Sequence, residues 1–347
     1  MPAEPPRPLR LDEVRDHLSA LGHDTAGVPS APFVLVDLDT RVDDPAAVED
    51  ALRRAEVVAV GVATRAPAPA HRGIVDALAC SLTTDPRPER TFVTVADPAA
   101  AAARLQGAVT GSPKAALAMR RLVEATTRLP VREGLSVESA VYSMLLAGEE
   151  FAGWLAGRTR RAVPARDGDA VELARAGDEL HVRLSVPERR NAFSRQLRDG
   201  MIEAFELALT DSTISTVVLT GAGPAFCSGG DLNEFGTSTD VSAAHVVRLQ
   251  RSAALRAHEL GARLEVRLHG ACIGAGVEIP SFAGRVVARD DARFALPELG
   301  MGLVPGAGGT VGITRRVGRW RCAWLHLSGE SIGVDVALAW GLVDERG

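Results

Sequence analysis

Two glycine-rich turns, each directly after an apolar run, are the first features of this sequence that could support chemistry. One is GAGPAFCSGGDLNEFG (221–236), after TVVLT, and the other is HGACIGAGVEIPS (269–281), after LEVRL. Small residues after a strand let the backbone approach a ligand and leave N–H groups free to point at an anion. Together the turns could form a two-donor oxyanion hole. Either turn alone could equally be a tight connection that packs a strand against a helix.

Two glutamates accompany these turns. Glu278 lies in the second turn, three residues after Ala275, and Glu298 follows Pro297 ahead of a further glycine-rich segment, GMGLVPGAGGT. Neighbouring carboxyls push their pKa values apart, which suits a base and an acid. An isolated glutamate, however, is usually a solvated charge, and a spacing of twenty residues does not itself bring the two together. Their chemistry therefore depends on the elements that position them.

Composition narrows the class of protein. The 347 residues carry a net charge of -5, with 46% hydrophobic and 24% charged residues, as in an ordinary globular protein. The negative charge argues against a nucleic-acid partner. We find no apolar run long enough for a membrane span, no secretory signal and no metal-ligand spacing. We expect free thiols, a cytoplasmic location and no metal, since none of the cysteines forms a C-x-x-C pair.

The sequence predicts an α/β protein in several parts. Residues 1–96 alternate apolar runs with helical patterns, which predicts a small α/β unit. Residues 97–158 are helical only. Two helices are expected there, broken at Gly111-Ser112-Pro113, and the spacing of apolar residues from Val137 to Leu155 then predicts one amphipathic helix. Residues 159–170 lack periodicity and predict a linker. Residues 171–347 restart the α/β pattern and contain the glycine turns, with helices expected at 194–209 and 243–260.

The second half resembles the crotonase (enoyl-CoA hydratase/isomerase) family. The resemblance is carried by PERRNAF, FCSGGDL, HGACIGAGVEI and FALPELGMGLVPGAGGT, in this order. It implies a crotonase-like spiral of ββα units with a helical trimerisation tail. In that family two backbone N–H groups polarise the thioester carbonyl of an acyl-CoA, and hydratases use two glutamates. The matching positions are Gly230 and Ala275 for the donors, and Glu278 and Glu298 for the acids.

The resemblance also implies a substrate and its binding. Arg189, Arg190 and Ala192 match positions that line the coenzyme A nucleotide, and no cofactor is expected beyond the coenzyme A of the thioester. The preferred function is an acyl-CoA hydratase or dehydratase that acts on a 2-enoyl-CoA or 3-hydroxyacyl-CoA. An enoyl-CoA double-bond isomerase or thioester hydrolase is the nearest alternative. A non-catalytic acyl-CoA-binding or assembly subunit is the alternative of another class.

Two departures from the family pattern lead to further expectations. Pro280, two residues after Glu278, is expected to kink the helix that carries this glutamate. Residues 97–158 resemble the family's helical tail, although they precede the core, and residues 1–96 look like a worn copy of the core, to which we assign no chemistry. We therefore expect residues 97–158 to pack on the second core, in the same chain or a neighbour. The resemblance implies a homo-oligomer, either a trimer or a hexamer.

Overall fold

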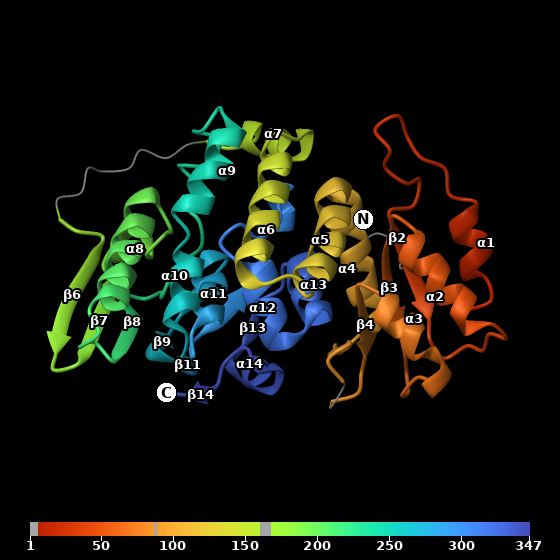
Figure 1. The fold of residues 1–347 in the computed structure, drawn as a ribbon. Helices are drawn as coiled ribbons and strands as arrows, with labels where there is room; N and C mark the ends of the chain where they lie inside the picture. The colour runs from red at the N-terminus through yellow and green to blue at the C-terminus, as the bar shows by residue number, and fades with distance from the viewer. Residues whose placement is uncertain (1–5, 87–88, 160–167) are drawn as a thin grey trace.

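The computed structural model describes residues 6–86, 89–159 and 168–347. Two α/β units lie at opposite ends of the molecule, and a group of helices lies between them (Figure 1). Most of the predicted linker, residues 160–167, falls outside the described residues. Within the described part of the chain, no helix has the length and apolarity that crossing a bilayer requires.

The first unit is a parallel sheet whose strands lie in chain order, β1-β2-β3-β4-β5. Alternate residues of β2 point to opposite faces, so that Val34 and Val36 pack with the first helices, whereas Phe33 and Leu35 join the large central core. Both faces are thus covered, as is usual for a parallel sheet. Its elements are β1 (Leu9–Arg10), α1 (Val14–Ser19), β2 (Phe33–Asp37), α2 (Pro45–Arg54), β3 (Val58–Val62), η1 (Pro69–His71), α3 (Arg72–Ala77), β4 (Cys80–Thr83) and β5 (Phe92–Thr94).

The helices that follow divide differently from the expected pattern. The predicted break before Pro113 separates α4 (Pro98–Gly111) from α5 (Pro113–Thr126). The prediction of one helix over 137–155 is wrong, because α6 (Val131–Leu146) and α7 (Glu149–Ala156) are separate. The apolar stripe was also misplaced: Met144 is 59% exposed, whereas Glu138 is 2% exposed. The physical reason is that α6 turns a polar face toward a cavity in the second unit.

The second unit has a six-stranded sheet of order β14-β11-β9-β8-β7-β6. Its described neighbouring strands are parallel, apart from the antiparallel pair β6 and β7. A smaller sheet, β10-β12-β13, completes the unit. The predicted helix over 243–260 is two helices, because Ser252 caps a new helix by accepting a hydrogen bond from Leu255 N at 3.2 Å. The elements are β6 (Val171–Ala176), β7 (Glu179–Leu184), η2 (Pro187–Arg189), α8 (Arg195–Thr210), β8 (Thr216–Gly221), α9 (Val241–Gln250), α10 (Ala253–Leu260), η3 (Gly261–Arg263), β9 (Leu264–Leu268), β10 (Ala271–Ile273), α11 (Ala275–Glu278), η4 (Pro280–Phe282), β11 (Arg285–Ala288), β12 (Arg293–Ala295), η5 (Glu298–Met301), α12 (Gly309–Val317), α13 (Arg319–Ser328), β13 (Ile332–Gly333), α14 (Val334–Trp340) and β14 (Glu345–Arg346).

The helical segment packs on the second unit of the same chain. Helices α5 and α6 contact α12, and α6 also contacts α9, as Figure 1 shows for the yellow α6 beside the teal α9. Thr126 Oγ1 donates to Thr310 O at 2.8 Å, and Arg315 Nη2 donates to Leu129 O at 2.6 Å. The expected packing of residues 97–158 on the second core is therefore confirmed, within one chain.

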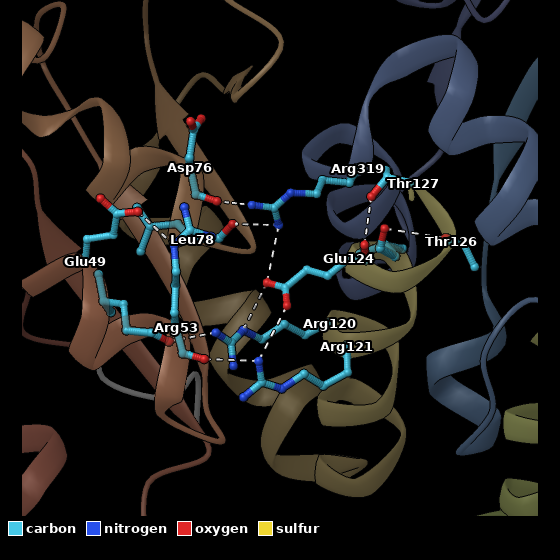
Figure 2. Close-up of polar contacts among 12 residues, drawn as sticks. Glu49, Arg53, Asp76, Leu78, Arg120, Arg121, Glu124, Thr126, Thr127 and Arg319 are labelled. Carbon is cyan, nitrogen blue, oxygen red and sulfur yellow. Dashed lines mark hydrogen bonds and ion pairs between the residues drawn. The ribbon is translucent and has the colours of Figure 1, made fainter. Parts of the chain in front are cut away.

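Arginines join the first unit to these helices (Figure 2). The Arg120 side chain, 2% exposed, donates to Leu52 O at 2.7 Å and Ala55 O at 2.5 Å, at the C-terminal end of α2. Arg319 of α13 donates to the carbonyls of Asp76 and Leu78, at the end of α3. The last carbonyls of a helix lack intrahelical partners and carry partial negative charge, so guanidinium groups satisfy them well.

Replacing Arg120 by methionine keeps much of the side-chain volume but leaves buried carbonyls without donors. We expect the free energy of unfolding to fall by about 2–4 kcal/mol, because each buried unsatisfied group costs roughly 1–3 kcal/mol. Urea unfolding followed by circular dichroism measures this. The control is Arg104→Met, whose ion pair with Glu330 is exposed, and which should cost less than about 1 kcal/mol. Equal stability of the Arg120→Met and Arg104→Met proteins would show that these carbonyls do not need Arg120.

Candidate active site

The two glycine turns lie side by side in the fold. Cys227 N donates to Ala271 O at 3.1 Å, and Ile273 N donates back to Cys227 O at 3.0 Å. A Cβ placed on Gly274 would lie 3.6 Å from Gly229 Cα, so the residues just before Gly230 and Ala275 are in contact. Within the described ranges, neither Gly230 N nor Ala275 N donates a hydrogen bond to the protein, and both residues line one cavity. Two free donors therefore border the same space, and their convergence on one oxygen stays a prediction.

Glu298 reaches over the second turn. Gly274 has φ +50, and a Cβ there would come within 2.7 Å of Glu298 Oε1, so only glycine leaves room for this carboxyl. Glu298 begins η5 after Pro297 and is 7% exposed. Its Oε2 atom is buried and has no hydrogen-bond partner in the described structure. This oxygen is available to a substrate.

Glu278 is held from outside its own helix. Helix α11 has only four residues, and the chain passes directly into the 3-10 turn that Pro280 begins. The expected kink at Pro280 is instead the end of the helix. A helix this short contributes local N–H groups rather than a long dipole. Instead, Glu278 Oε2 accepts hydrogen bonds from Ala307 N at 2.7 Å and Gly309 N at 2.9 Å, which fix the aim of the carboxyl.

A third carboxyl comes from the half of the chain to which the sequence assigned no chemistry. Glu138 of α6 is 2% exposed. It accepts hydrogen bonds from Gly308 N at 2.7 Å, Thr310 N at 2.9 Å and Thr310 Oγ1 at 2.6 Å. Glu138 and Glu278 therefore hold alternate amides of one turn, which runs from Gly306 to Thr310 at the start of α12. Glu138 is a positioning residue, because its oxygens are committed to this turn.

Burial shapes the electrostatics of these carboxyls. Burial raises the pKa of Glu278 to about 7, opposed by its two amide hydrogen bonds. Burial and the charge of Glu278 raise the pKa of Glu138 to about 8 and hold the pKa of Glu298 well above its usual range. The three groups cannot all be charged at neutral pH. Two backbone amides support the charged form of Glu278, whereas Glu298 Oε2 is buried without a hydrogen-bond partner in the described structure, so burial opposes the ionisation of Glu298.

The cavity has a volume of about 670 Å³, and its wall is largely apolar. Both halves of the chain contribute to it. Helices α6 and α7 supply one side, including Leu135, Tyr142 and Trp154, and the second unit supplies Phe235 and Met301. An apolar cavity with a few convergent polar groups has the form of a small-molecule site. Among residues 6–86, 89–159 and 168–347, no group of three or more His, Cys, Asp or Glu residues is placed to hold a metal ion.

The other candidate residues lie outside the cavity wall. Arg189 forms an ion pair with the buried Asp231, and Arg190 is exposed with φ 52. Ala192 is partly buried beside them. None of these three lines the cavity that holds the carboxyls, so their expected contact with the coenzyme A nucleotide remains a prediction about a neighbouring surface.

Sequence reasoning missed the contribution of α6. The polar residues Glu138, Ser139, Tyr142 and Ser143 recur three or four positions apart, which places them on one helix face. That spacing was the available signal. It was overlooked because the apolar residues interleaved with them also have helical spacing.

Comparisons with known proteins agree with this geometry. A sequence model of the enoyl-CoA hydratase/isomerase family matches residues 179–346. YngF of Bacillus subtilis, assigned to the same hydratase/isomerase group, is 31% identical over 180 residues, which cover 51% of this chain and 69% of YngF. The chain belongs to the enoyl-CoA hydratase/isomerase family. Its described fold is α/β, with parallel sheets and helices.

Individual relatives differ in their reactions. The chain is 37% identical over 166 residues to 2,3-dehydroadipyl-CoA hydratase of Escherichia coli, covering 48% of this chain and 64% of that protein. It is 31% identical over 165 residues to 1,2-epoxyphenylacetyl-CoA isomerase of Escherichia coli, and the match covers 46% of this chain and 63% of the isomerase. A crystal structure of enoyl-CoA hydratase from Thermoplasma volcanium matches 52% of this chain and 72% of the hydratase chain. The matched sequences are 33% identical, and the TM-score is 0.48. The chain thus spans less than two thirds of the first two relatives.

Replacing Glu138 by glutamine tests whether α6 supports the site. The new amide N–H group would face the backbone donors of Gly308 and Thr310, which should disturb the turn that holds Glu278 and lower turnover about 10-fold or more. Because the pKa of Glu138 lies above that of Glu278, Glu138 is protonated where Glu278 ionises, and the acidic limb of the pH–rate profile should stay in place. Steady-state rates across this pH range measure both effects. The control is Glu133→Gln on the exposed side of α6, which should leave turnover unchanged. Full turnover in Glu138→Gln would reduce Glu138 to a packing residue.

Proposed function

We propose that the chain is an acyl-CoA hydratase or dehydratase, which adds or removes water at a 2-enoyl-CoA or 3-hydroxyacyl-CoA. One observation carries this proposal: two buried carboxyls, Glu278 and Glu298, share a cavity with the free backbone donors of Gly230 and Ala275. The names of the hydratase relatives support it.

The geometry suits hydration step by step. Glu278, whose charged form two backbone amides support, takes a proton from water as the water oxygen bonds to C3 of the enoyl thioester. The electrons move to the thioester oxygen, and the N–H groups of Gly230 and Ala275 stabilise the resulting enolate; one such donor is typically worth about 10²- to 10³-fold in rate. Glu298 then delivers its proton to C2. Each proton transfer contributes about 10²- to 10⁴-fold. Dehydration is the same path in reverse.

An isomerase is the second candidate, and the likeness to 1,2-epoxyphenylacetyl-CoA isomerase favours it. Isomerisation or thioester hydrolysis can proceed with one acid, whereas hydration uses a base and an acid together. The presence of two buried carboxyls on one cavity therefore favours hydration. Both carboxyls also weigh against a non-catalytic acyl-CoA binder, because burying charged groups without a role is costly.

Several sequence-based expectations belong to the same proposal. Arg189, Arg190 and Ala192 contact the coenzyme A nucleotide, since guanidinium groups are suited to phosphate. The enzyme is a cytoplasmic homo-oligomer, a trimer or a hexamer. Residues 1–96 are a worn copy of the core. In support, the strands of the first sheet and of the six-stranded sheet each lie in chain order, and all of these neighbours are parallel except β6 and β7.

A screen of acyl-CoA thioesters by mass spectrometry tests the reaction. A gain or loss of one water on a 2-enoyl-CoA or 3-hydroxyacyl-CoA is the expected result. A change in double-bond position without water, or release of free coenzyme A, would replace the hydratase by an isomerase or a thioesterase. Binding without any chemical change would indicate the non-catalytic alternative.

Replacing Glu278 or Glu298 by glutamine should each lower turnover by about 10²-fold or more, because each variant lacks one proton-transfer group. Coenzyme A binding, measured by calorimetry, should remain nearly unchanged in both. The exposed Glu133→Gln variant serves again as the control. Full activity in Glu278→Gln would demote the protein to a one-acid isomerase or hydrolase.

Activity should depend on pH in a bell-shaped manner. The base must be charged, so the rate should rise through pH about 7 as Glu278 ionises. The acid must be protonated, so the rate should fall again at higher pH when Glu298, whose pKa is raised by burial, loses its proton. Steady-state rates across this range measure both limbs. A rate already maximal near pH 5 would mean that Glu278 is not the base.

A further inference from the structure

We propose that Arg248 binds a carboxylate at the far end of the acyl group, so that the preferred substrate is an acyl-CoA whose acyl chain carries a terminal anion. This inference rests on the proposed function, because it assumes that the thioester sits at Gly230 and Ala275. It concerns another part of the wall of the same cavity.

Arg248 differs from the other arginines that line the cavity. Arg132 pairs with Glu259 at 3.1 Å, and Arg198 and Arg251 both pair with Asp199, at 2.8 and 3.0 Å. Within the described ranges, Arg248 has no ion pair with a carboxylate. A guanidinium that faces an apolar cavity without a counter-charge is costly unless a ligand supplies that charge.

The protein holds the Arg248 side chain in place by neutral groups. Its Nε donates to Ser139 Oγ at 3.1 Å, Nη2 donates to Ser143 Oγ, and the guanidinium carbon lies 4.9 Å from the centre of the Tyr142 ring. Ser139 and Ser143 are four residues apart on α6, so one helix face fixes the group. The other terminal nitrogen, Nη1, makes no hydrogen bond to any described residue. A positioned fork with a free N–H edge is suited to a carboxylate.

The position of Arg248 relative to Glu278 and Glu298 indicates where the acyl chain of the substrate would lie. The Tyr142 ring packs against Gly306, where a Cβ would lie 2.6 Å from the ring. The next residue, Ala307, donates to Glu278. Arg248 and the turn that holds Glu278 therefore both pack against the Tyr142 ring. An acyl chain that begins at the oxyanion donors and follows this wall would bring a terminal carboxylate to Arg248.

A phosphate of coenzyme A is the other source of negative charge. The residues expected to contact the nucleotide, Arg189, Arg190 and Ala192, lie outside the cavity wall, whereas Arg248 shares that wall with Glu278 and Glu298. Glu138 attracts Arg248 through space, but its oxygens accept hydrogen bonds from Gly308 and Thr310, and it forms no ion pair with Arg248 in the described structure. The position of Arg248 thus favours contact with the end of the acyl chain over contact with a coenzyme A phosphate.

Binding of saturated acyl-CoAs tests the inference without requiring turnover. Calorimetry compares pairs of equal chain length, one ending in a carboxylate and one in a methyl group, over a series of lengths. At the length that reaches Arg248, the native protein should bind the carboxylate ligand about 10- to 100-fold more tightly, as a hydrogen bond to a charged group allows. Arg248→Met should remove this preference and leave the methyl-ended ligand bound as before.

Arg132→Met, which removes another cavity arginine that already has a carboxylate partner, is the matched control and should retain the preference. Equal weakening of both ligands in Arg248→Met would assign Arg248 to the coenzyme A phosphates, and no preference in the native protein at any length would also overturn the inference. If Arg248→Met does not fold, Arg248→Lys, with its single point charge, should show a reduced preference. A preference without any gain or loss of water in the substrate screen would reject the proposed reaction but not the anion site.

Discussion

The turn from Gly306 to Thr310 is the feature on which the site depends. Its successive amides alternate between two carboxyls: Ala307 and Gly309 donate to Glu278, and Gly308 and Thr310 donate to Glu138. Gly308 has φ +106, and a Cβ on Gly309 would come within 2.8 Å of Glu278 Cγ. Only glycine therefore allows both carboxyls to approach one short stretch of backbone. Without this turn, neither the aim of Glu278 nor the buried position of Glu138 would be defined.

Placing three carboxyls together out of water opposes stability, and the same arrangement creates their reactivity. Burial raises the pKa values of Glu138, Glu278 and Glu298, the charge of Glu278 raises those of Glu138 and Glu298 further, and hydrogen bonds oppose these shifts to different extents. A carboxyl supported by two amides and a carboxyl with a free, buried oxygen can then differ in charge at the same pH. The wall contributed by α6 and α7 excludes water from one side of this space, which strengthens these effects.

Arginine side chains connect the first α/β unit to the rest of the protein. Lys114 is the only lysine of the sequence. At the border of the first unit, Arg120 and Arg319 each donate to two carbonyls at helix ends, which a single ammonium group satisfies less well (Figure 2). Glu124 lies between them and offsets their charge. The first unit is thereby attached to α5 and α13, which pack directly behind the turn that carries the site. In this way a part of the chain with no assigned chemistry supports the part that has it.

The sequence by itself determined the elements and the family. Apolar runs and glycine turns predicted an α/β unit in each half of the chain, strands such as β2, β3, β8 and β9, and the break before Pro113, because these depend on local backbone preferences. The resemblance of the motifs around Gly230, Ala275, Glu278 and Glu298 to one family indicated the kind of site.

Only the tertiary structure decided which half of the chain completes that site. The division of α6 from α7, the burial of Glu138 and the unpaired charge of Arg248 depend on contacts between residues more than 100 positions apart. The sequence pattern around a polar helix residue is the same whether its side chain faces water or a cavity. What separates the two cases is the surface against which the helix packs, and that surface exists only in the folded chain.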